Sequence, residues 1–298
     1  MTPEILLDRS FSLQKSRAFF LEKGLVEIDS PILQSYPSID AYIDLLEVKK
    51  GGYLHSSPEF YLKKLLSRFS KEVFYLGHVF RKEEDGAKHS SEFTMAEWYR
   101  KNFTLEQMIQ ETLAFIALFI SFSKIEKLSY QELFLKFYAP DPLDASLESL
   151  REFCRKKAFD LFSIERDFYL HLIFSHYLEP HLDADTLYII EDFPKSQAAL
   201  AKTEVKKGKE IAKRFEIYFQ GLELANGYEE LTEKEVQKKR FISENQIRVS
   251  LKKEPYPLDP SFLQALDSLP ACCGVSVGFD RLMMLRHKAK NIQEVIHS

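Results

Sequence analysis

The 298-residue sequence has no apolar stretch of membrane-spanning length and no recognisable leader. Its most apolar run, residues 113–122, is about half of the roughly 20 residues that a spanning helix needs. The first residues, MTPEILLDRSF, lack the basic segment and apolar core of a secretory signal. We therefore expect a cytoplasmic protein without a membrane partner.

Cysteine is scarce, and positive charge is not in excess. Cys154, Cys272 and Cys273 form no C-x-x-C pair and no disulfide framework, which favours a reducing compartment. The formal net charge is −4, so no overall basic field predicts nucleic-acid binding. A hydrophobic content of 45% and a charged content of 29% are typical of a globular protein with one large domain or two small ones.

The most informative stretch covers residues 73–100. Two apolar and aromatic runs, 73–80 and 92–99, flank a polar segment, which is typical of two antiparallel strands joined by a long loop. Because side chains alternate along a strand, one face of the second run carries Phe93, Met95, Glu97 and Tyr99. A carboxylate on such a face is costly unless it meets a cation or a hydrogen-bond donor.

Arg81 and Glu83 lie two residues apart at the start of the polar segment. A planar guanidinium there suits a phosphate, because it offers two parallel donors. Taken alone, the pair favours a surface hairpin whose charges face water, because such triplets are common.

The whole block resembles motif 2 of the class II aminoacyl-tRNA synthetases, whose lysine branch reads F-R-N-E and then H-N-P-E-F-T-M-x-E-x-Y. Here it reads F-R-K-E from Phe80 and H-S-S-E-F-T-M-A-E-W-Y from His89. The E-W-Y ending is more similar to a shortened branch, the lysine ligases that modify elongation factor P. The resemblance implies an α+β catalytic domain with a mixed, mainly antiparallel sheet flanked by helices. One such domain would span residues 1–298, with a helical insertion at 126–185.

Residues 24–31, with the pattern G-x-x-E-x-x-x-P, are similar to motif 1 of this family, which implies a homodimer through the region around Pro31. Alone, this pattern fits a helix and an edge strand. Lysyl-tRNA synthetases carry an anticodon-binding β-barrel before motif 1, and the preceding residues leave no room for it. We therefore expect that domain to be missing and a tRNA partner to be unlikely.

Ser57, Pro58 and Glu59 form a helix-start signal, with serine as the cap and proline at the first position. The helix dipole alone accounts for an acid at position 59. In the family, the glutamate of this S-P-E segment holds an amino group of the substrate, and we assign Ser57 and Glu59 to that site.

Residues 213–231 predict a second hairpin, with a turn at Gln220-Gly221. Individually its acids fit a solvated surface, but the segment is similar to the family pattern R-F-E-x-x-x-x-G-x-E-x-x-N-G-x-x-E-L. The resemblance implies that Glu216 and Glu223 hold the Mg²⁺ that accompanies ATP, through hard oxygen ligands. It also implies ATP contacts at Glu223 and Leu224 and substrate contacts at Asn226 and Glu230.

Residues 274–285 pass from an apolar strand to an amphipathic helix, and glycines at 274 and 278 allow close backbone approach to a ligand. Alone, this is an ordinary strand–helix junction, but it resembles motif 3. The resemblance implies that Gly278 and Arg281 belong to the ATP site, with Arg281 on the adenine and near the γ-phosphate.

The implied reaction is attack of a substrate carboxylate on the α-phosphorus of ATP, followed by transfer of the acyl group. Arg81 and Arg281 would be catalytic, because such transfers need positioning and charge neutralisation. Adenine would lie between Phe93 and Arg281. The remaining ATP contacts would come from Glu83, His89 and Ser90, which replaces the asparagine common in motif 2.

The substrate is inferred from charge. Glu59, Glu97 and Glu230, together with Tyr99, would form an anionic site that suits a diamino acid, so lysine or (R)-β-lysine is expected. Position 276 is glycine in the synthetases and usually alanine in the ligases, and a side chain there favours an amine on the β-carbon. Ser276 therefore leaves the preferred isomer open.

The acceptor is expected to be a lysine side chain of elongation factor P. Two alternatives stay open: a minimal tRNA ligase similar to lysyl-tRNA synthetase, and a non-catalytic amino-acid sensor with the same fold. Sensors tend to lose the arginine or the magnesium acids, which this sequence keeps. An acidic partner would suit a lysine cluster formed by Lys202, Lys206, Lys207, Lys209 and Lys213.

Overall fold

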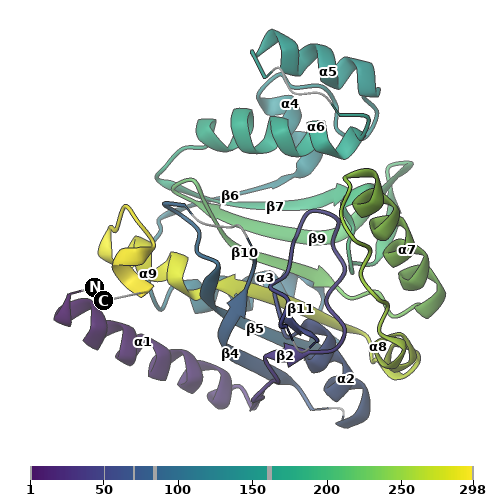
Figure 1. The fold of residues 1–298 in the computed structure, drawn as a ribbon. Coiled ribbons are helices and arrows are strands. Elements are labelled where there is room, and N and C mark those ends of the chain that lie inside the picture. Colours follow the sequence, from purple (N-terminus) through teal and green to yellow (C-terminus); the bar gives the residue numbers. More distant parts are fainter. Residues whose placement is uncertain (1, 50, 70, 83–85, 160–162, 297–298) are drawn as a thin grey trace. The chain divides into compact units, whose positions relative to one another are not determined.

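The computed structural model describes residues 2–49, 51–69, 71–82, 86–159 and 163–296. The chain forms two compact units, and Figure 1 labels most of their elements. The first unit combines Met1–Ser121 with Glu229–Ser298, and the second is Phe122–Tyr228.

The sheet of the first unit holds the strands predicted around the long loop. Its strands are β1 (Val26–Glu27), β4 (Val73–Phe80), β5 (Glu92–Lys101) and β11 (Cys272–Gly278). β1 pairs with β4 in parallel, whereas β5 pairs antiparallel with β4 on one side and with β11 on the other. A separate antiparallel pair joins β2 (Leu33–Gln34) to β3 (Tyr53–Leu54).

The helices of the first unit are α1 (Pro3–Glu22), α2 (Glu59–Phe69), α3 (Leu105–Ile116), α7 (Lys234–Ser250), α8 (Pro260–Ala265), α9 (Phe279–His287) and α10 (Gln293–Ile296). Side chains cap α1, α3 and α8, through Thr2, Thr104 and Asp259. Thr104 and Gln107 form a reciprocal capping box at α3. The apolar run extends to residue 122, but the helix ends at Ile116 and turns follow. Apolar residues still follow the helix because part of this segment is buried: Phe119 packs edge-on against Phe279, with ring centroids 5.4 Å apart.

Aromatic rings pack α1 and α3 onto one face of this sheet. Phe20 lies 4.6 Å from Phe74 and 5.0 Å from Trp98 between ring centroids, and Phe115 lies 5.1 Å from Phe20. All four side chains are fully buried. Because Trp98 faces these helices, its neighbours on β5, Glu97 and Tyr99, face the opposite side.

A second aromatic group holds α2 in place. Phe60, on the first turn of α2, stacks on Phe262 of α8 with ring centroids 3.9 Å apart, and Phe241 of α7 lies 5.6 Å from Phe60. These rings bury the face of α2 that adjoins Glu59. The start of α2 is therefore fixed by packing as well as by its cap.

The second unit is also built on a mixed, mainly antiparallel sheet. Its strands are β6 (Lys124–Ser129), β7 (Thr186–Pro194), β8 (Thr203–Lys206), β9 (Lys209–Phe219) and β10 (Leu222–Glu229). β9 pairs antiparallel with β7, β8 and β10, whereas β6 pairs with β7 in parallel. The β9–β10 turn has positive φ at Gln220 (51°) and Gly221 (67°), the conformation that suits a two-residue hairpin.

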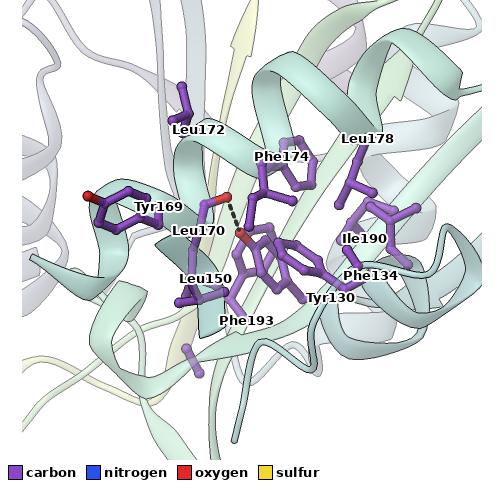
Figure 2. Packing of buried hydrophobic residues seen from close by; sticks show 14 of the residues in the cluster. Tyr130, Phe134, Leu150, Tyr169, Leu170, Leu172, Phe174, Leu178, Ile190 and Phe193 are labelled. Carbon is purple, nitrogen blue, oxygen red and sulfur yellow. Dashed lines mark hydrogen bonds between the residues drawn. The ribbon is translucent and has the colours of Figure 1, made fainter. Parts of the chain in front are cut away.

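The helices of the second unit pack on a core around Tyr130. They are α4 (Tyr130–Lys136), α5 (Leu147–Lys156) and α6 (Arg166–Ile173), which continues as a π-helical turn, Phe174–Leu178. Figure 2 shows Tyr130 among Phe134, Phe174 and Phe193, with its hydroxyl group donating to the carbonyl oxygen of Leu170 at 3.5 Å. Short 3₁₀ turns at Glu179–His181, Lys195–Gln197 and, in the first unit, Leu266–Ser268 complete the described structure.

The α+β architecture predicted from the sequence is confirmed, with a mixed sheet and flanking helices. The described part of residues 126–185 contains helices, and whether they form an insertion within one catalytic domain stays a prediction. Within the described residues, no helix combines the length and apolar composition needed to cross a bilayer.

The packing behind α2 gives a test of the fold. Phe241→Ala should lower the free energy of unfolding by about 3–5 kcal/mol, because the fully buried ring would leave a cavity beside Phe60 and Phe262. The neighbouring substitution Ile242→Ala is the control, since that side chain is 43% exposed and its loss should cost under about 1 kcal/mol. Urea denaturation measures both, and equal losses would show that α7 does not pack as described.

Candidate functional site

The middle of β5 brings together most of the side chains singled out in the sequence. Figure 1 shows β4, β5 and β11 side by side. In the β5–β11 register, Ser276 lies opposite Glu97 and Gly274 opposite Tyr99. On the other side, Tyr75 of β4 lies opposite Glu97. Because opposed residues in an antiparallel pair share a face, all five lie on the face turned away from Trp98.

Glu97 is fully buried on this face and is held by two hydroxyl groups. Ser57 donates to Oε2 at 2.7 Å, and Tyr99 donates to Oε1 at 2.8 Å. Loss of hydration and the nearby charge of Glu59 nevertheless raise the pKa of Glu97 to about 8. The strand thus carries the carboxylate that the sequence predicts on this face, and two neutral hydroxyl groups donate to it.

Ser57 links this carboxylate to the start of α2. Its hydroxyl oxygen accepts from the backbone N–H of Glu59 at 3.0 Å while its hydrogen is donated to Glu97. The predicted capping serine therefore has a second contact. Through it, the cap of α2 fixes Glu59 close to the acidic face of β5.

Lys63 is the residue of this site that the sequence prediction missed. Its ammonium group is fully buried, 2.6 Å from Oε1 of Glu59 and 2.5 Å from Oε2 of Glu230. It also lies 5.7 Å from the ring centroid of Tyr99. Burial lowers the pKa of Lys63, but the charges of Glu230 and Glu59 outweigh burial and the net shift is upward. The sequence did contain a signal for Lys63. Glu59 and Lys63 are four residues apart, so their side chains face each other across one helical turn.

Glu230 is fully buried next to Cys272, the first residue of β11. Its backbone N–H donates to the carbonyl oxygen of Cys272 at 3.0 Å. Burial raises its pKa to about 8 although Lys63 opposes the shift. Among the described residues, Oε1 of Glu230 has no hydrogen-bond partner. Such an orphaned acceptor is costly, so it marks a place where a ligand donor would be stabilised.

Gly274 makes room for this carboxylate. A Cβ atom at this position would lie 2.4 Å from Oε1 of Glu230 and 2.3 Å from the ring of Tyr99. Only glycine allows the backbone of β11 to approach both groups. We call Glu59, Glu97 and Glu230 the acidic cluster.

A second group of predicted residues lies near the loop end of β4 and β5. The guanidinium of Arg81 lies 5.2 Å from the ring centroid of Phe93, and both side chains are half-buried. The backbone N–H of Arg81 donates to the carbonyl oxygen of Ser91 at 3.0 Å. In the loop, Gly86 and His89 bond to each other, and Ser90 is buried whereas His89 is exposed. Glu83, predicted to contact the adenine, lies outside the described residues.

Arg281 lies on the first turn of α9. A Cβ atom added at Gly278 would lie 3.5 Å from the Cδ atom of Arg281. Its neighbour Asp280 is buried and accepts from the backbone N–H of Thr94 at 2.6 Å. Arg9 of α1 forms an ion pair with Asp280 and donates to the hydroxyl oxygen of Thr94 at 2.8 Å. These bonds hold the residue before Arg281 against the residue after Phe93.

The predicted metal ligands belong to the second unit, on one face of the β9–β10 hairpin. Glu223 lies opposite Tyr218 and Asn226 opposite Glu216, with a shift of register between Glu223 and Ala225. Residues 223 and 226 would face opposite sides of a regular strand, and this bulge places both on the face of Glu216. Leu224, within the bulge, has a buried side chain.

Glu216 is held in place by its neighbours on the hairpin. It forms an ion pair with Arg214 and accepts a hydrogen bond from the hydroxyl of Tyr218 at 2.6 Å. Both carboxylates offer hard oxygen atoms, the ligands that Mg²⁺ prefers. Among the described residues, no three histidine, cysteine, aspartate or glutamate side chains gather as a metal-binding group. A Mg²⁺ that arrives with a nucleotide needs only one or two carboxylates, so the pair fits that role.

Comparison with known proteins assigns the chain to a family. The family model for class II tRNA synthetases of the D, K and N group matches residues 2–297. The chain belongs to the class II aminoacyl-tRNA synthetase family.

Curated members of this family that resemble the chain are named elongation factor P–(R)-β-lysine ligase. The one from Haemophilus ducreyi is 39% identical over 98% of this chain and 93% of its own length. Those from Photorhabdus laumondii and Buchnera aphidicola are 36% and 37% identical, over 98% of this chain and 93% and 94% of theirs. The predicted resemblance to the shortened lysine-ligase branch of the class II synthetases is therefore confirmed.

Within this family framework, the structure brings the predicted substrate contacts of the first unit together. Ser57, Glu59, Glu97, Tyr99 and Glu230 are linked by direct contacts through Lys63 and Gly274. Arg81 lies against Phe93, and Gly278 against Arg281. The individual roles of these residues in the ligase reaction stay predictions.

The raised pKa values predict how stability depends on pH. Folded Glu97 and Glu230 hold protons up to about pH 8, whereas the unfolded chain releases them above its ordinary pKa of 4.5. Stability should therefore fall as pH rises from 5 to 8, by at most about 1.4 kcal/mol per pH unit for each proton. Glu97→Gln should make this decline shallower in urea titrations at several pH values. Glu92→Gln, at an exposed site on the same strand, is the control, and an unchanged slope in Glu97→Gln would contradict the assignment.

Proposed function

We propose that this chain activates (R)-β-lysine, or lysine, with ATP and transfers the acyl group to a lysine side chain of elongation factor P. The observation that carries this proposal is the acidic cluster, with an orphaned oxygen on Glu230. Two buried carboxylates, the partly exposed Glu59 and one buried lysine leave negative charge for the ammonium groups of a diamino acid. The names of the relatives from three bacteria support the same substrate and acceptor.

In the first step, an oxygen of the substrate carboxylate attacks the α-phosphorus of ATP. A new O–P bond forms, the bond to the β-phosphate bridge breaks, and pyrophosphate leaves. The chain supplies no nucleophile, because the attacking carboxylate is already ionised near neutral pH. Arg81 would neutralise charge on the α-phosphate with its two parallel donors.

The adenine would be held between Phe93 and Arg281, with Glu83 reading its amino group and His89 and Ser90 near the phosphates. The support is local: a bond from Asp280 to Thr94 fixes the neighbours of both residues. Glu216 and Glu223 would hold Mg²⁺, which supplies charge neutralisation for the phosphate chain. Leu224 and Asn226 accompany them on the hairpin.

In the second step, the ε-amine of an acceptor lysine attacks the acyl carbon of the adenylate. A C–N bond forms, AMP leaves, and the amine loses a proton. The lysine cluster is a weak docking surface for an acidic acceptor, because its charge is partly neutralised within the chain. Lys206 pairs with Asp192, Lys209 with Asp144, and Lys213 with Glu204 at 3.3 Å.

The preferred isomer would depend on Ser276. This half-buried residue lies opposite Glu97 on the neighbouring strand, two residues from Gly274. Its side chain fills space that a glycine would leave open beside the acidic cluster. We infer a preference for an amine on the β-carbon.

We further propose a homodimer through the region around Pro31. Large apolar side chains are exposed on α1 and on the segment that follows it. They are Leu6, Leu7, Phe11, Leu21, Ile32 and Leu33, with exposed fractions from 43% to 65%. A group of this kind is typical of a protein–protein interface.

Amino-acid-dependent ATP–pyrophosphate exchange tests the proposed function. The assay compares α-lysine with both enantiomers of β-lysine, and we expect the strongest exchange with (R)-β-lysine. Transfer to elongation factor P should then follow, and should be lost when its acceptor lysine is replaced by arginine. A preference for α-lysine with transfer to tRNA would favour a tRNA ligase. No exchange with any isomer would favour a sensor.

Glu230→Gln should weaken substrate use more than ATP use. Losing one charge-assisted contact to an ammonium group costs about 2–3 kcal/mol, which raises the KM for (R)-β-lysine about 30- to 150-fold. The KM for ATP should stay within about twofold of wild type. Glu92→Gln again serves as control, and an equal rise in both KM values would remove Glu230 from the substrate site.

A further inference from the structure

Lys63 is a buried cation within the acidic site that the proposed substrate needs. Its ammonium group contacts two of the three carboxylates of the acidic cluster, at 2.6 Å and 2.5 Å. A side chain that only supported α2 would be less costly if it were apolar, since burying a cation is expensive. The charge of Lys63, and not support of α2, therefore explains why a lysine is buried here.

Lys63 contacts Glu59 and one oxygen of Glu230, and the remaining carboxylate oxygens of the cluster meet no cation among the described residues. Glu59 and Lys63 form an ion pair within one helix, four residues apart. Glu97 accepts only from neutral hydroxyl groups among the described residues, and Oε1 of Glu230 accepts from none. With Lys63 charged and all three acids ionised, the cluster carries two negative charges in excess. A diamino acid carries two ammonium groups.

We propose that Lys63 is a specificity-determining residue, whose ammonium group cancels one charge of the acidic cluster and leaves two carboxylates to bind the two ammonium groups of the substrate. This inference rests on the proposed function and deepens it. Lys63 acts through Glu59 and Glu230 and is a positioning residue, because its own contacts are to these acids.

The groups around the cluster determine which of them change charge near neutral pH. Lys63 stays charged, because its pKa is raised by Glu230 and Glu59. Tyr99 stays neutral since burial raises its pKa well above the ordinary value, and burial raises the pKa of Tyr75 to about 12. His55, beside Tyr75, stays neutral because burial lowers its pKa.

Glu97 and Glu230 therefore titrate as a pair near pH 8 in the ligand-free protein. At pH 7 both carboxyl groups are mostly protonated. Each ammonium group of the substrate displaces one of these protons when it binds. Binding of the substrate should thus release protons, approaching two, and should strengthen as the pH rises from 7 to 9.

Removing Lys63 should shift this balance. In Lys63→Met three acids share the site without a cation, so they hold protons more tightly. Calorimetric titration with (R)-β-lysine should show at least tenfold weaker binding at pH 7, with part of the loss recovered at pH 9. The KM in ATP–pyrophosphate exchange should rise in parallel, with the KM for ATP unchanged. Lys64→Met is the matched control, because Lys64 lies on the same helix and pairs with Asp259 outside the cluster.

Two further variants separate charge from shape. Lys63→Arg keeps the charge, so its binding should retain the pH dependence of wild type even where its size weakens affinity. The double variant Lys63→Met with Glu59→Gln removes the cation and one acid together. It should bind (R)-β-lysine at least as well as Lys63→Met alone, a coupling that independent structural losses would not produce. It also serves as the folded reference where the single variant unfolds.

The outcomes are distinguishable. If wild type binds the diamino acid and Lys63→Met keeps its affinity and its pH dependence, the inference about Lys63 is wrong and the proposed function stands. Glu59→Gln alone is measured too, and a double variant whose loss of affinity equals the sum of the losses in Lys63→Met and Glu59→Gln would overturn the inference as well. If wild type binds no isomer of lysine, the proposed function fails, and the inference fails with it.

Discussion

The first unit is organised by the need to hold three carboxylates beside one strand, two of them fully buried. Each acid is stabilised in a different way: Glu59 by an ion pair within its helix, Glu97 by two hydroxyl donors, and Glu230 by Lys63 on one side alone. Because an uncompensated buried charge costs several kcal/mol, these contacts constrain the helix start, the strand register and the approach of β11 together. The elements around the cluster cannot shift independently of one another.

Much of this arrangement is readable from sequence, since it depends on local rules. Alternation along β5 predicts that Glu97 and Tyr99 share a face, and the Ser57-Pro58 signal predicts the start of α2. The structure confirms both elements. The capping box at Thr104 is local in the same sense. The motif resemblance adds what local rules cannot, namely which distant segments supply the remaining acids.

The missed features depend on contacts between segments that are far apart in the chain. Lys63 reads as an ordinary helix lysine until Glu230 is placed beside it. The bulge after Glu223 is invisible to a two-residue period, because Leu222, Glu223 and Leu224 alternate between apolar and charged as in a regular strand. At α7 a local rule misleads: Thr232 and Glu235 have the spacing of a capping box, but Glu233 is the N-cap and makes no side-chain capping bond.

The bonds around Asp280 connect parts of the first unit that have separate predicted tasks. Arg9 lies on α1, the helix with the exposed apolar side chains, and reaches both Asp280 and Thr94. Burial raises the pKa of Asp280, and Arg9 and the Thr94 N–H oppose that shift. A displacement of α1 would therefore be felt at the residues that adjoin Phe93 and Arg281, without passing through the acidic cluster.

On β11, position 274 has no room for a side chain, whereas position 276 already holds one. Any side chain at 274 would overlap both Tyr99 and Glu230, two groups that have no space to retreat. Position 276 lies next to them on the same face and already holds a side chain. Attempts to redesign the enzyme for bulkier or differently branched amino acids should therefore vary residue 276 in a library and leave residue 274 untouched.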